Sequence, residues 1–217
     1  MIFAGRMGNY ELLQALIRKN VAFNSRDEDT GNTVFMEALY MKHFHFILKA
    51  LEKYSDPRAF NAQNSFSEES LLHMAVKAGS FELVEALLVK EGIRPNLQDG
   101  HGKTILHLAL EEPLHAMLAL ILSKAQGLDV NIADRKGRTP LITAVKKQNT
   151  EGLRIFLAHP GVAVNVQWKD ELGKDACQYT ANTQQRFILL QYIESTGKDY
   201  VNSKTLRKNI QDEERKY

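Results

Sequence analysis

The chain repeats itself at intervals of about 35 residues, and this period constrains its possible folds more than any other feature. Asn61, Asn96, Asn131 and Asn165 follow one another at separations of 35, 35 and 34 residues by subtraction. Four alanines recur at a similar period: Ala38, Ala75, Ala109 and Ala144. A chain with such a period is expected to fold as a series of like units, each of which buries its apolar face against the next.

Each unit shows the same order of local signals. A polar turn with glycine is followed by a short helix that begins at Thr or Ser, then by a second, amphipathic helix and an Asn. Ser and Thr are favoured at a helix start because the hydroxyl oxygen accepts a hydrogen bond from a backbone N–H. Within one second helix, Leu83, Val84, Leu87 and Leu88 form an apolar stripe that the next unit must cover. The aligned segments are 33–38, 70–75, 104–109 and 139–144, with a degraded copy at 175–180.

These segments resemble the ankyrin-repeat family, whose signature is Thr-Pro-Leu-His-x-Ala in a period of about 33 residues. The resemblance covers residues 1 to 194 or so and implies an all-α ankyrin-repeat solenoid of about six stacked helix-turn-helix repeats with β-turn or hairpin tips. The expected repeats are 1–27, 28–64, 65–98, 99–133, 134–167 and 168–194. The remaining residues, 195–217, form a charged tail whose thin apolar stripe is Val201, Leu206 and Ile210. We expect this tail to be weakly helical or disordered.

Composition constrains the compartment in which the chain is expected and the kinds of partner it can bind. A net charge of +2 over 217 residues gives no general attraction to nucleic acid or membranes. Cys177 is the only cysteine, so no intrachain disulfide can form, and a reducing intracellular compartment, cytoplasmic or nuclear, is expected. The apolar runs are far shorter than the roughly 20 residues that cross a bilayer, and the opening residues do not match a signal peptide. No membrane insertion is therefore expected.

No catalytic, metal or cofactor site stands out from the repeat pattern. Gly102-Lys103-Thr104 resembles the end of a phosphate-binding loop, but Leu97 stands where that loop needs a glycine. His43 and His45 are two residues apart and would point away from each other on a helix. Cys177 falls in a column of apolar residues and is expected in the core. The sequence therefore predicts a protein that is not an enzyme and that needs no cofactor.

The resemblance also implies a structural role for two histidines and a place for a partner. His73 and His107 occupy the histidine position of the signature, where the side chain bonds to a neighbouring turn. A partner is expected on a concave surface made of the turn tips and the exposed positions of each first helix. The residues of this sequence at those positions are Tyr40, Met41, Phe66, Lys77, His101, Lys103, Glu111, Glu112, Arg135, Lys136, Arg138, Lys146, Lys147, Trp168 and Lys174.

Two parts of this set predict the chemistry of the partner. Tyr40, Met41 and Phe66 are large apolar residues of the kind that anchor interfaces. The fifth repeat contributes five cations without a carboxylate at these positions, and the single tryptophan, Trp168, is expected at a protruding tip. We therefore expect a partner protein that has an acidic segment next to an apolar anchor. The alternatives are a solvated basic face, and a Phe66 ring folded down onto the stack.

The functional class expected from these features is a non-enzymatic protein–protein interaction module that acts as an adaptor, scaffold or inhibitor. One alternative is a regulator of a transcription factor similar to the inhibitors of the kappa-B type. A second is a targeting or substrate-recruiting domain of a larger enzyme or of a pathogen effector. A third is nucleic-acid binding by the fifth-repeat cations, which the net charge of +2 opposes.

Overall fold

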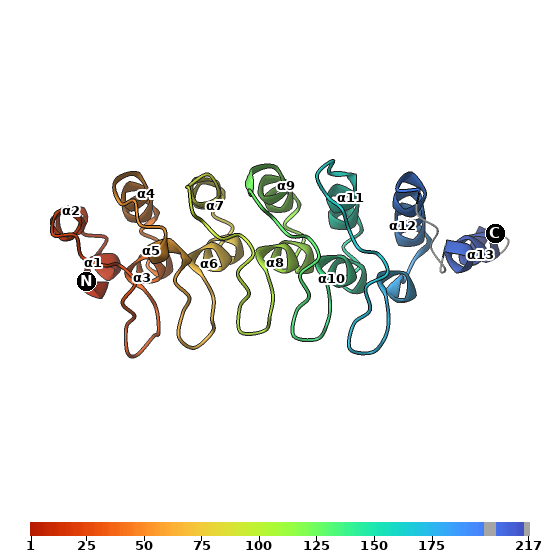
Figure 1. The fold of residues 1–217 in the computed structure, drawn as a ribbon, viewed down its shortest axis with the longest axis horizontal. Helices are drawn as coiled ribbons and strands as arrows, with labels where there is room; N and C mark the ends of the chain where they lie inside the picture. Colours follow the sequence, from red (N-terminus) through yellow and green to blue (C-terminus); the bar gives the residue numbers. More distant parts are fainter. Residues whose placement is uncertain (198–202, 215–217) are drawn as a thin grey trace. The chain divides into compact units, whose positions relative to one another are not determined.

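A computed structural model describes residues 1–197 and 203–214 of the chain (Figure 1). Within these ranges the secondary structure is helical and contains no strand. Two isolated bridges, Arg26 with Thr33 and Gln63 with Ser70, pair the arms of two hairpin loops. The all-α repeat fold expected from the sequence is confirmed. Val201 of the expected tail stripe lies outside the described residues.

The chain forms two compact units. Unit 1 comprises Met1–Ile105 and Ser123–Leu128, and unit 2 comprises Leu106–Leu122 and Asp129–Tyr217. Most of α8 (Ile105–Glu111) and α9 (His115–Lys124) therefore belongs to unit 2. Each repeat consists of a hairpin loop, a first helix and a second helix, and the first repeat begins directly with its first helix.

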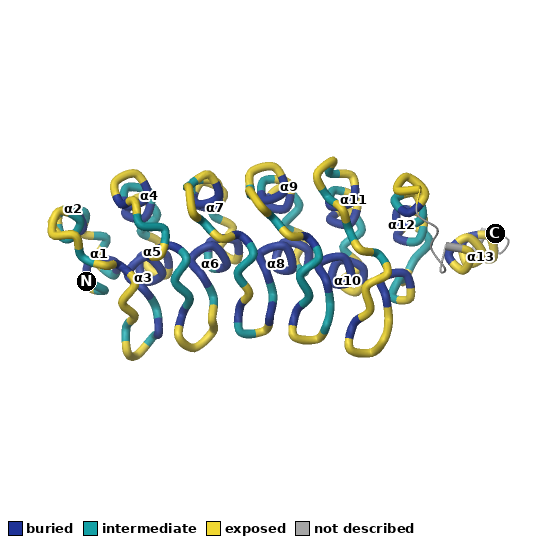
Figure 2. The backbone as a smooth tube through the Cα atoms, viewed as in Figure 1, coloured by how far each residue is buried: buried dark blue, intermediate teal, exposed yellow. Residues whose placement is uncertain are grey.

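Unit 1 is built from three such helix pairs. The first helices are α1 (Ile2–Met7), α3 (Val34–Tyr40) and α6 (Leu71–Lys77), and the second helices are α2 (Tyr10–Arg18), α4 (Phe44–Lys53) and α7 (Phe81–Leu88). The first helices pack side by side, α1 on α3 and α3 on α6, while α4 packs on both α2 and α7. Buried residues dominate α3 and α6 in Figure 2, whereas the loop tips of the same repeats are largely exposed. The first helices therefore carry the core, and the loops carry the surface.

The repeated small residues permit this close packing. Ala38 and Ala75 are completely buried, and the stripe from Leu83 to Leu88 leaves no more than 5% of any of its apolar side chains exposed. Gly5 lies so close to α3 that a Cβ there would be 2.1 Å from the carbonyl oxygen of Val34. Only a residue without a side chain fits at this contact.

The extra residues between the second and third repeats form a helix that the repeat pattern does not predict. α5 (Arg58–Asn61) is a single turn, and Asp56 accepts a hydrogen bond from the backbone N–H of Arg58 at 2.9 Å. The turn places Phe60 in the core, where its ring stacks on Phe35 at a centroid distance of 4.8 Å. The insertion thus enlarges the core of unit 1.

Unit 2 continues the pattern and then departs from it. α10 (Pro140–Lys146) and α11 (Thr150–Ala158) form a regular pair. In the last repeat the first helix shrinks to the 3-10 turn η1 (Ala176–Tyr179), followed by α12 (Thr183–Ser195). Asp175 caps η1 by accepting from the backbone N–H of Gln178 at 3.1 Å. Cys177 within η1 is buried, as expected.

The chain beyond α12 contains one further helix, α13 (Ser203–Glu214), which packs on α12. Leu206 and Ile210 are buried, and Arg207 forms an ion pair with Glu194 at 2.6 Å. Two apolar residues and one ion pair thus link this helix to α12. In the described ranges, none of the helices is long and apolar enough to cross a membrane.

Candidate functional site

One polar side chain organises each hairpin tip. Its Oδ1 atom accepts hydrogen bonds from backbone N–H groups two to four residues later, at 2.7 to 3.2 Å. The residues in this role are Asp27, Asn64, Asp99, Asp134 and Asp170. Their separations are 37, 35, 35 and 36 residues by subtraction, so the period is visible in the sequence although the role was not expected from it. These bonds hold each tip in one conformation.

Side chains also tie each tip to the next repeat. Asn61, Asn96 and Asn131 donate through Nδ2 to backbone carbonyls of the following repeat at 2.7 to 2.9 Å. His73 Nε2 lies 3.1 Å from the carbonyl oxygen of Lys103, and His107 Nε2 lies 2.9 Å from that of Arg138. The structural role expected for the two histidines is confirmed. The tips are therefore positioned by side chains inside the stack and not by the loops alone.

In unit 1 the expected apolar anchors lie at the surface. The exposed fractions are 73% for Tyr40, 44% for Met41 and 69% for Phe66. The Phe66 ring lies against the preceding tip, where a Cβ on Gly31 would be 2.9 Å from its Cδ2 atom. The ring is thus held beside the tip and does not fold into the core. Two further exposed residues of α1, Phe3 and Met7, were not expected from the sequence.

Ion pairs involve several charged residues of unit 1, among them the predicted site residue Lys77. Lys77 pairs with Glu69, while His101 is exposed at the third tip and Lys103 is partly covered beside it. Arg6 pairs with Glu37 at 2.9 Å. Burial raises the pKa of Glu37, but hydrogen bonds led by that from Arg6 outweigh it and hold the pKa below its ordinary value.

The five cations of the fifth repeat need a correction, because carboxylates neutralise three of them. Arg138 pairs with Asp134 at 2.5 Å and Lys147 pairs with Glu111 at 2.9 Å. Lys146 Nζ lies 4.0 Å from a carboxylate oxygen of Asp170. Arg135 and Lys136 are exposed at the tip. The uncompensated basic face expected from the sequence is therefore wrong, since its carboxylates come from the tip turn and from neighbouring repeats.

A hydrogen bond within the last repeat joins its tip to η1. Tyr179 donates its hydroxyl to Asp170 at 2.6 Å, and Lys146 Nζ lies 4.2 Å from the centre of the Tyr179 ring. The bond to Asp170, with burial and the negative charge as smaller causes, raises the pKa of Tyr179 to about 12. Tyr179 therefore stays a neutral donor at physiological pH and fixes the last tip.

Trp168 is not at a protruding tip, which is a second correction. Its indole Nε1 donates to the carbonyl of Gly137 at 2.9 Å, and 40% of the residue is exposed. It lies in the arm of its hairpin because the tip turn begins two residues later, at Asp170. Two predicted site residues of unit 2 remain. Lys174 Nζ lies 5.6 Å from the centre of the Tyr179 ring. Glu112 is exposed directly after α8.

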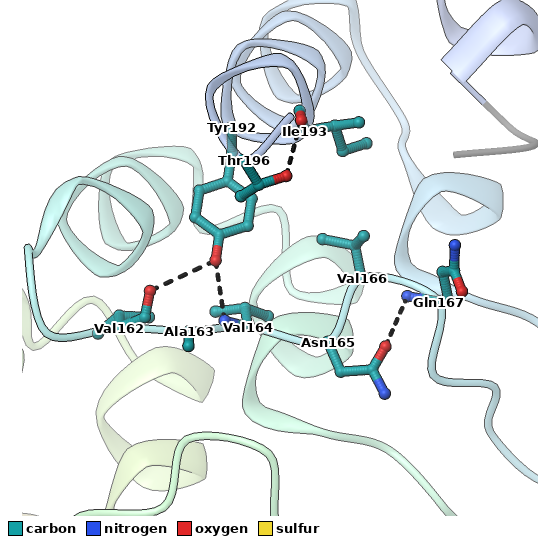
Figure 3. Close-up of a pocket in the computed structure, with 9 residues that line it drawn as sticks. All are labelled: Val162, Ala163, Val164, Asn165, Val166, Gln167, Tyr192, Ile193 and Thr196. Atoms are coloured by element: carbon teal, nitrogen blue, oxygen red, sulfur yellow. Dashed lines mark hydrogen bonds between the residues drawn. The ribbon is translucent and has the colours of Figure 1, made fainter. Parts of the chain in front are cut away.

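A hollow of about 510 Å³ beside α12 is lined without any ionisable side chain except the tyrosine hydroxyl of Tyr192 (Figure 3). It is lined by Val162, Ala163, Val164, Asn165, Val166, Gln167, Tyr192, Ile193 and Thr196. The Tyr192 hydroxyl accepts from the backbone N–H of Val164 at 2.8 Å and donates to the carbonyl of Val162 at 3.3 Å. Carboxylate, imidazole, thiol and cationic groups are all missing from this lining. Elsewhere in the described part of the chain, no group of three or more His, Cys, Asp or Glu residues could hold a metal ion.

The sequence matches a family model and several known proteins. Residues 1–99 and 72–168 match a family model described as ankyrin repeats (3 copies), so the matches together extend over residues 1–168. The chain is 30% identical over 164 residues to the nuclear factor NF-kappa-B p105 subunit of Gallus gallus, which is 74% of this chain and 16% of that protein. It is 28% identical over 152 residues to Rabankyrin-5 of Mus musculus, covering 63% of this chain and 12% of that protein. The chain thus spans about a sixth or less of the length of these relatives.

Solved structures agree on the fold. The ankyrin repeat domain of Bcl-3, described as a member of the IkappaB protein family, has a TM-score of 0.71 at 20% identity over 91% of this chain and 86% of that chain. An ankyrin repeat domain from Acinetobacter baumannii has a TM-score of 0.73 at 20% identity over 88% of this chain and 96% of that chain. At this level of identity the similarity concerns the fold alone.

Proposed function

The chain belongs to the ankyrin-repeat family, and from this premise we propose that it is a non-enzymatic module that binds a partner protein through its hairpin tips and first helices. Ankyrin repeats bind other proteins, so the proposal concerns the surface and the partner. The observation that carries it is the exposure of Tyr40, Met41 and Phe66 within unit 1. Large apolar side chains that remain in water cost free energy, which burial under a partner recovers.

Rigidity supports the same proposal. The tip side chains, such as Asn64 beside Phe66, fix the loop conformation before a partner arrives. A preformed surface loses little conformational entropy on binding, so more of the contact energy becomes affinity. The expected partner is a protein with an acidic segment next to an apolar anchor, which the chain meets in an intracellular compartment, cytoplasmic or nuclear.

A second candidate is a regulator of a transcription factor. Its support is the similarity to the p105 subunit of NF-kappa-B and to Bcl-3. Rabankyrin-5 is nearly as similar, however, and so is the E3 ubiquitin-protein ligase KEG of Arabidopsis thaliana, at 30% identity over 118 residues. The match to KEG supports a third candidate, a recruiting domain of a larger enzyme. Nucleic-acid binding loses its support, because three cations of the fifth repeat pair with carboxylates.

The test is affinity capture from an intracellular extract with two matched variants. The first combines Tyr40→Ser, Met41→Ser and Phe66→Ser. The control combines Phe81→Ser and Val89→Ser, which remove exposed apolar side chains from α7 and the residue that follows it. We expect one set of captured proteins to disappear with the first variant and to remain with the control, once circular dichroism shows that both are folded. Equal capture by all three chains would contradict the proposal, whereas the identities of the lost proteins distinguish the second and third candidates.

A further inference from the structure

The last two hairpin tips, residues 134–138 and 170–174, are in direct contact within unit 2. The backbone N–H of Glu171 donates to the carbonyl of Lys136 at 3.2 Å, and Trp168 donates to Gly137. A Cβ on Gly137 would be 2.9 Å from the nitrogen of Glu171 and 3.1 Å from the Cα atom of Asp170. The two tips therefore form one continuous surface with no room for a side chain between them at this point.

Two apolar side chains are exposed on this surface. Leu172 is 71% exposed, and Trp168 is 40% exposed with its polar nitrogen already bonded. The tip turn uses only the backbone of Leu172, whose N–H donates to Asp170 at 3.0 Å. A leucine is not required for the turn, because a polar side chain would make the same backbone bond and remain solvated. The exposed Leu172 side chain is therefore available for contact with another molecule.

Lysines border these apolar side chains. Lys136, Lys169 and Lys174 are exposed, and within residues 1–197 and 203–214 none of the three forms an ion pair. In this they differ from Arg138 and Lys147, which form ion pairs with carboxylates of the same chain. The lysines without an ion pair therefore lie at these tips or directly before them, next to the exposed carboxylate of Glu171, and not along α10.

We infer that the surface formed by this tip pair and by the hairpin arm just before residue 170, defined by Lys136, Trp168, Lys169, Leu172 and Lys174, docks a protein segment in which acidic residues flank an apolar side chain. The inference rests on the proposed protein-binding function and assigns its acid-binding part to the two tips. The apolar side chain of the segment packs on Leu172 and on the exposed part of Trp168. Its carboxylates bind the three lysines, which fixes the direction and register of the segment. The phosphates of a nucleic acid would bind the lysines, but this binding would not depend on an apolar contact with Leu172.

The probe is a displayed library of random peptides selected on the full chain. We expect the enriched peptides to combine Asp or Glu with a nearby Leu, Phe, Met or Trp. For the strongest peptide, the combined variant Lys136→Glu, Lys169→Glu, Lys174→Glu should weaken binding by about tenfold or more. Leu172→Ser should weaken it by several-fold, and added salt should weaken binding to the unaltered chain. Arg154→Glu, a charge reversal on α11 outside the tips, is the matched control and should leave binding unchanged.

Three results would overturn the inference. They are a library without acidic and apolar enrichment, a selected peptide insensitive to both tip variants, and binding that falls with the lysine changes but is unaffected by Leu172→Ser. The third result indicates general attraction for polyanions, including nucleic acid. A peptide that is lost only with the changes at Tyr40, Met41 and Phe66 leaves the proposed function standing and refutes this site alone. Failure of the protein capture described above refutes the function itself.

Discussion

Replacing Gly5 by alanine tests whether α1 and α3 are as closely packed as the structure shows. Alanine is the better helix former, by about 1 kcal/mol, so helix propensity alone predicts a more stable protein. The new Cβ would lie 2.1 Å from the carbonyl oxygen of Val34 and 2.9 Å from its Cγ2 atom. Real contacts of a Cβ stay above 3.0 Å, so α1 must move by at least 3.0 − 2.1 = 0.9 Å.

A shift of this size is costly because the obstructing oxygen belongs to the backbone. A gap of up to 1 Å forfeits a quarter to a half of each dispersion contact, here along a helix whose Ala4 is completely buried. Overpacking of this kind costs about 1–3 kcal/mol, and a rigid obstacle places Gly5→Ala at the upper end. After subtraction of the propensity gain, we expect a net destabilisation of about 2 kcal/mol.

The assay is urea unfolding followed by circular dichroism, with hydrogen exchange to locate the effect. In a repeat protein each unit contacts only its neighbours, so exchange should accelerate mainly in α1 and α2. Gly161→Ala is the control, because its Cβ would meet nothing closer than a ring atom of His159 at 3.7 Å. It should change stability by less than about 0.5 kcal/mol. A Gly5→Ala chain as stable as the original, or more stable, would refute the reasoning.

Three further predictions address the core, the bridges between repeats and the response to pH. Leu87→Ala should cost about 2–5 kcal/mol by opening a cavity at a fully buried site, whereas Lys146→Ala should cost less than about 1 kcal/mol; similar losses in urea unfolding would contradict the assigned repeat positions. Asn131→Ala removes two hydrogen bonds to the next repeat and should cost about 1–2 kcal/mol with faster amide exchange there, and unchanged exchange would argue against the bridge. Burial lowers the pKa of His73 below its unfolded value of about 6.5, so the unfolded chain takes up this proton first and the urea midpoint should fall as the pH drops below about 6.5. Hydrogen bonds from Arg138 outweigh burial and lower the pKa of the paired carboxylate of Asp134, so stability should fall further below about pH 4. His73→Gln should remove the fall of the urea midpoint near about pH 6.5 and leave the fall near about pH 4. A urea midpoint that does not change between about pH 7 and pH 5 would refute the role given to His73.

Much of the fold could be predicted because it is written in local, repeated signals. The recurring asparagines predicted the stacking of repeats, and the stripe from Leu83 to Leu88 predicted a helix face that is buried. His73 and His107 were expected to bond neighbouring turns, and they do. Such features depend on residues a few positions apart or one period apart, so their geometry follows from the helix and the repeat.

The candidate binding surface was less predictable. Exposure of Tyr40 and Phe66 could be expected from their positions in the repeat. The ion pairing of the fifth-repeat cations could not, because their carboxylate partners stand at other positions of the repeat alignment. Asp134 belongs to the tip turn, and Glu111 and Asp170 come from the repeats on either side. Whether a lysine is free for a partner depends on which side chains of neighbouring repeats reach it, and this is a matter of distance across the stack.

The sequence therefore established the repeat unit, its helices, its core positions and the membership of the family. The three-dimensional arrangement settled that α5 carries Phe60 into the core, that Gly5 must lack a side chain, that Trp168 is tied to the preceding tip, and that three fifth-repeat cations are already paired. The physical reason is the range of the interactions. Helix propensity, capping and apolar periodicity act within a few residues and leave a readable pattern. The ion pairs of Lys146 and Lys147, the steric contact of Gly5 and the hydrogen bond of Trp168 instead join neighbouring repeats, whose side chains meet only after the repeats have stacked.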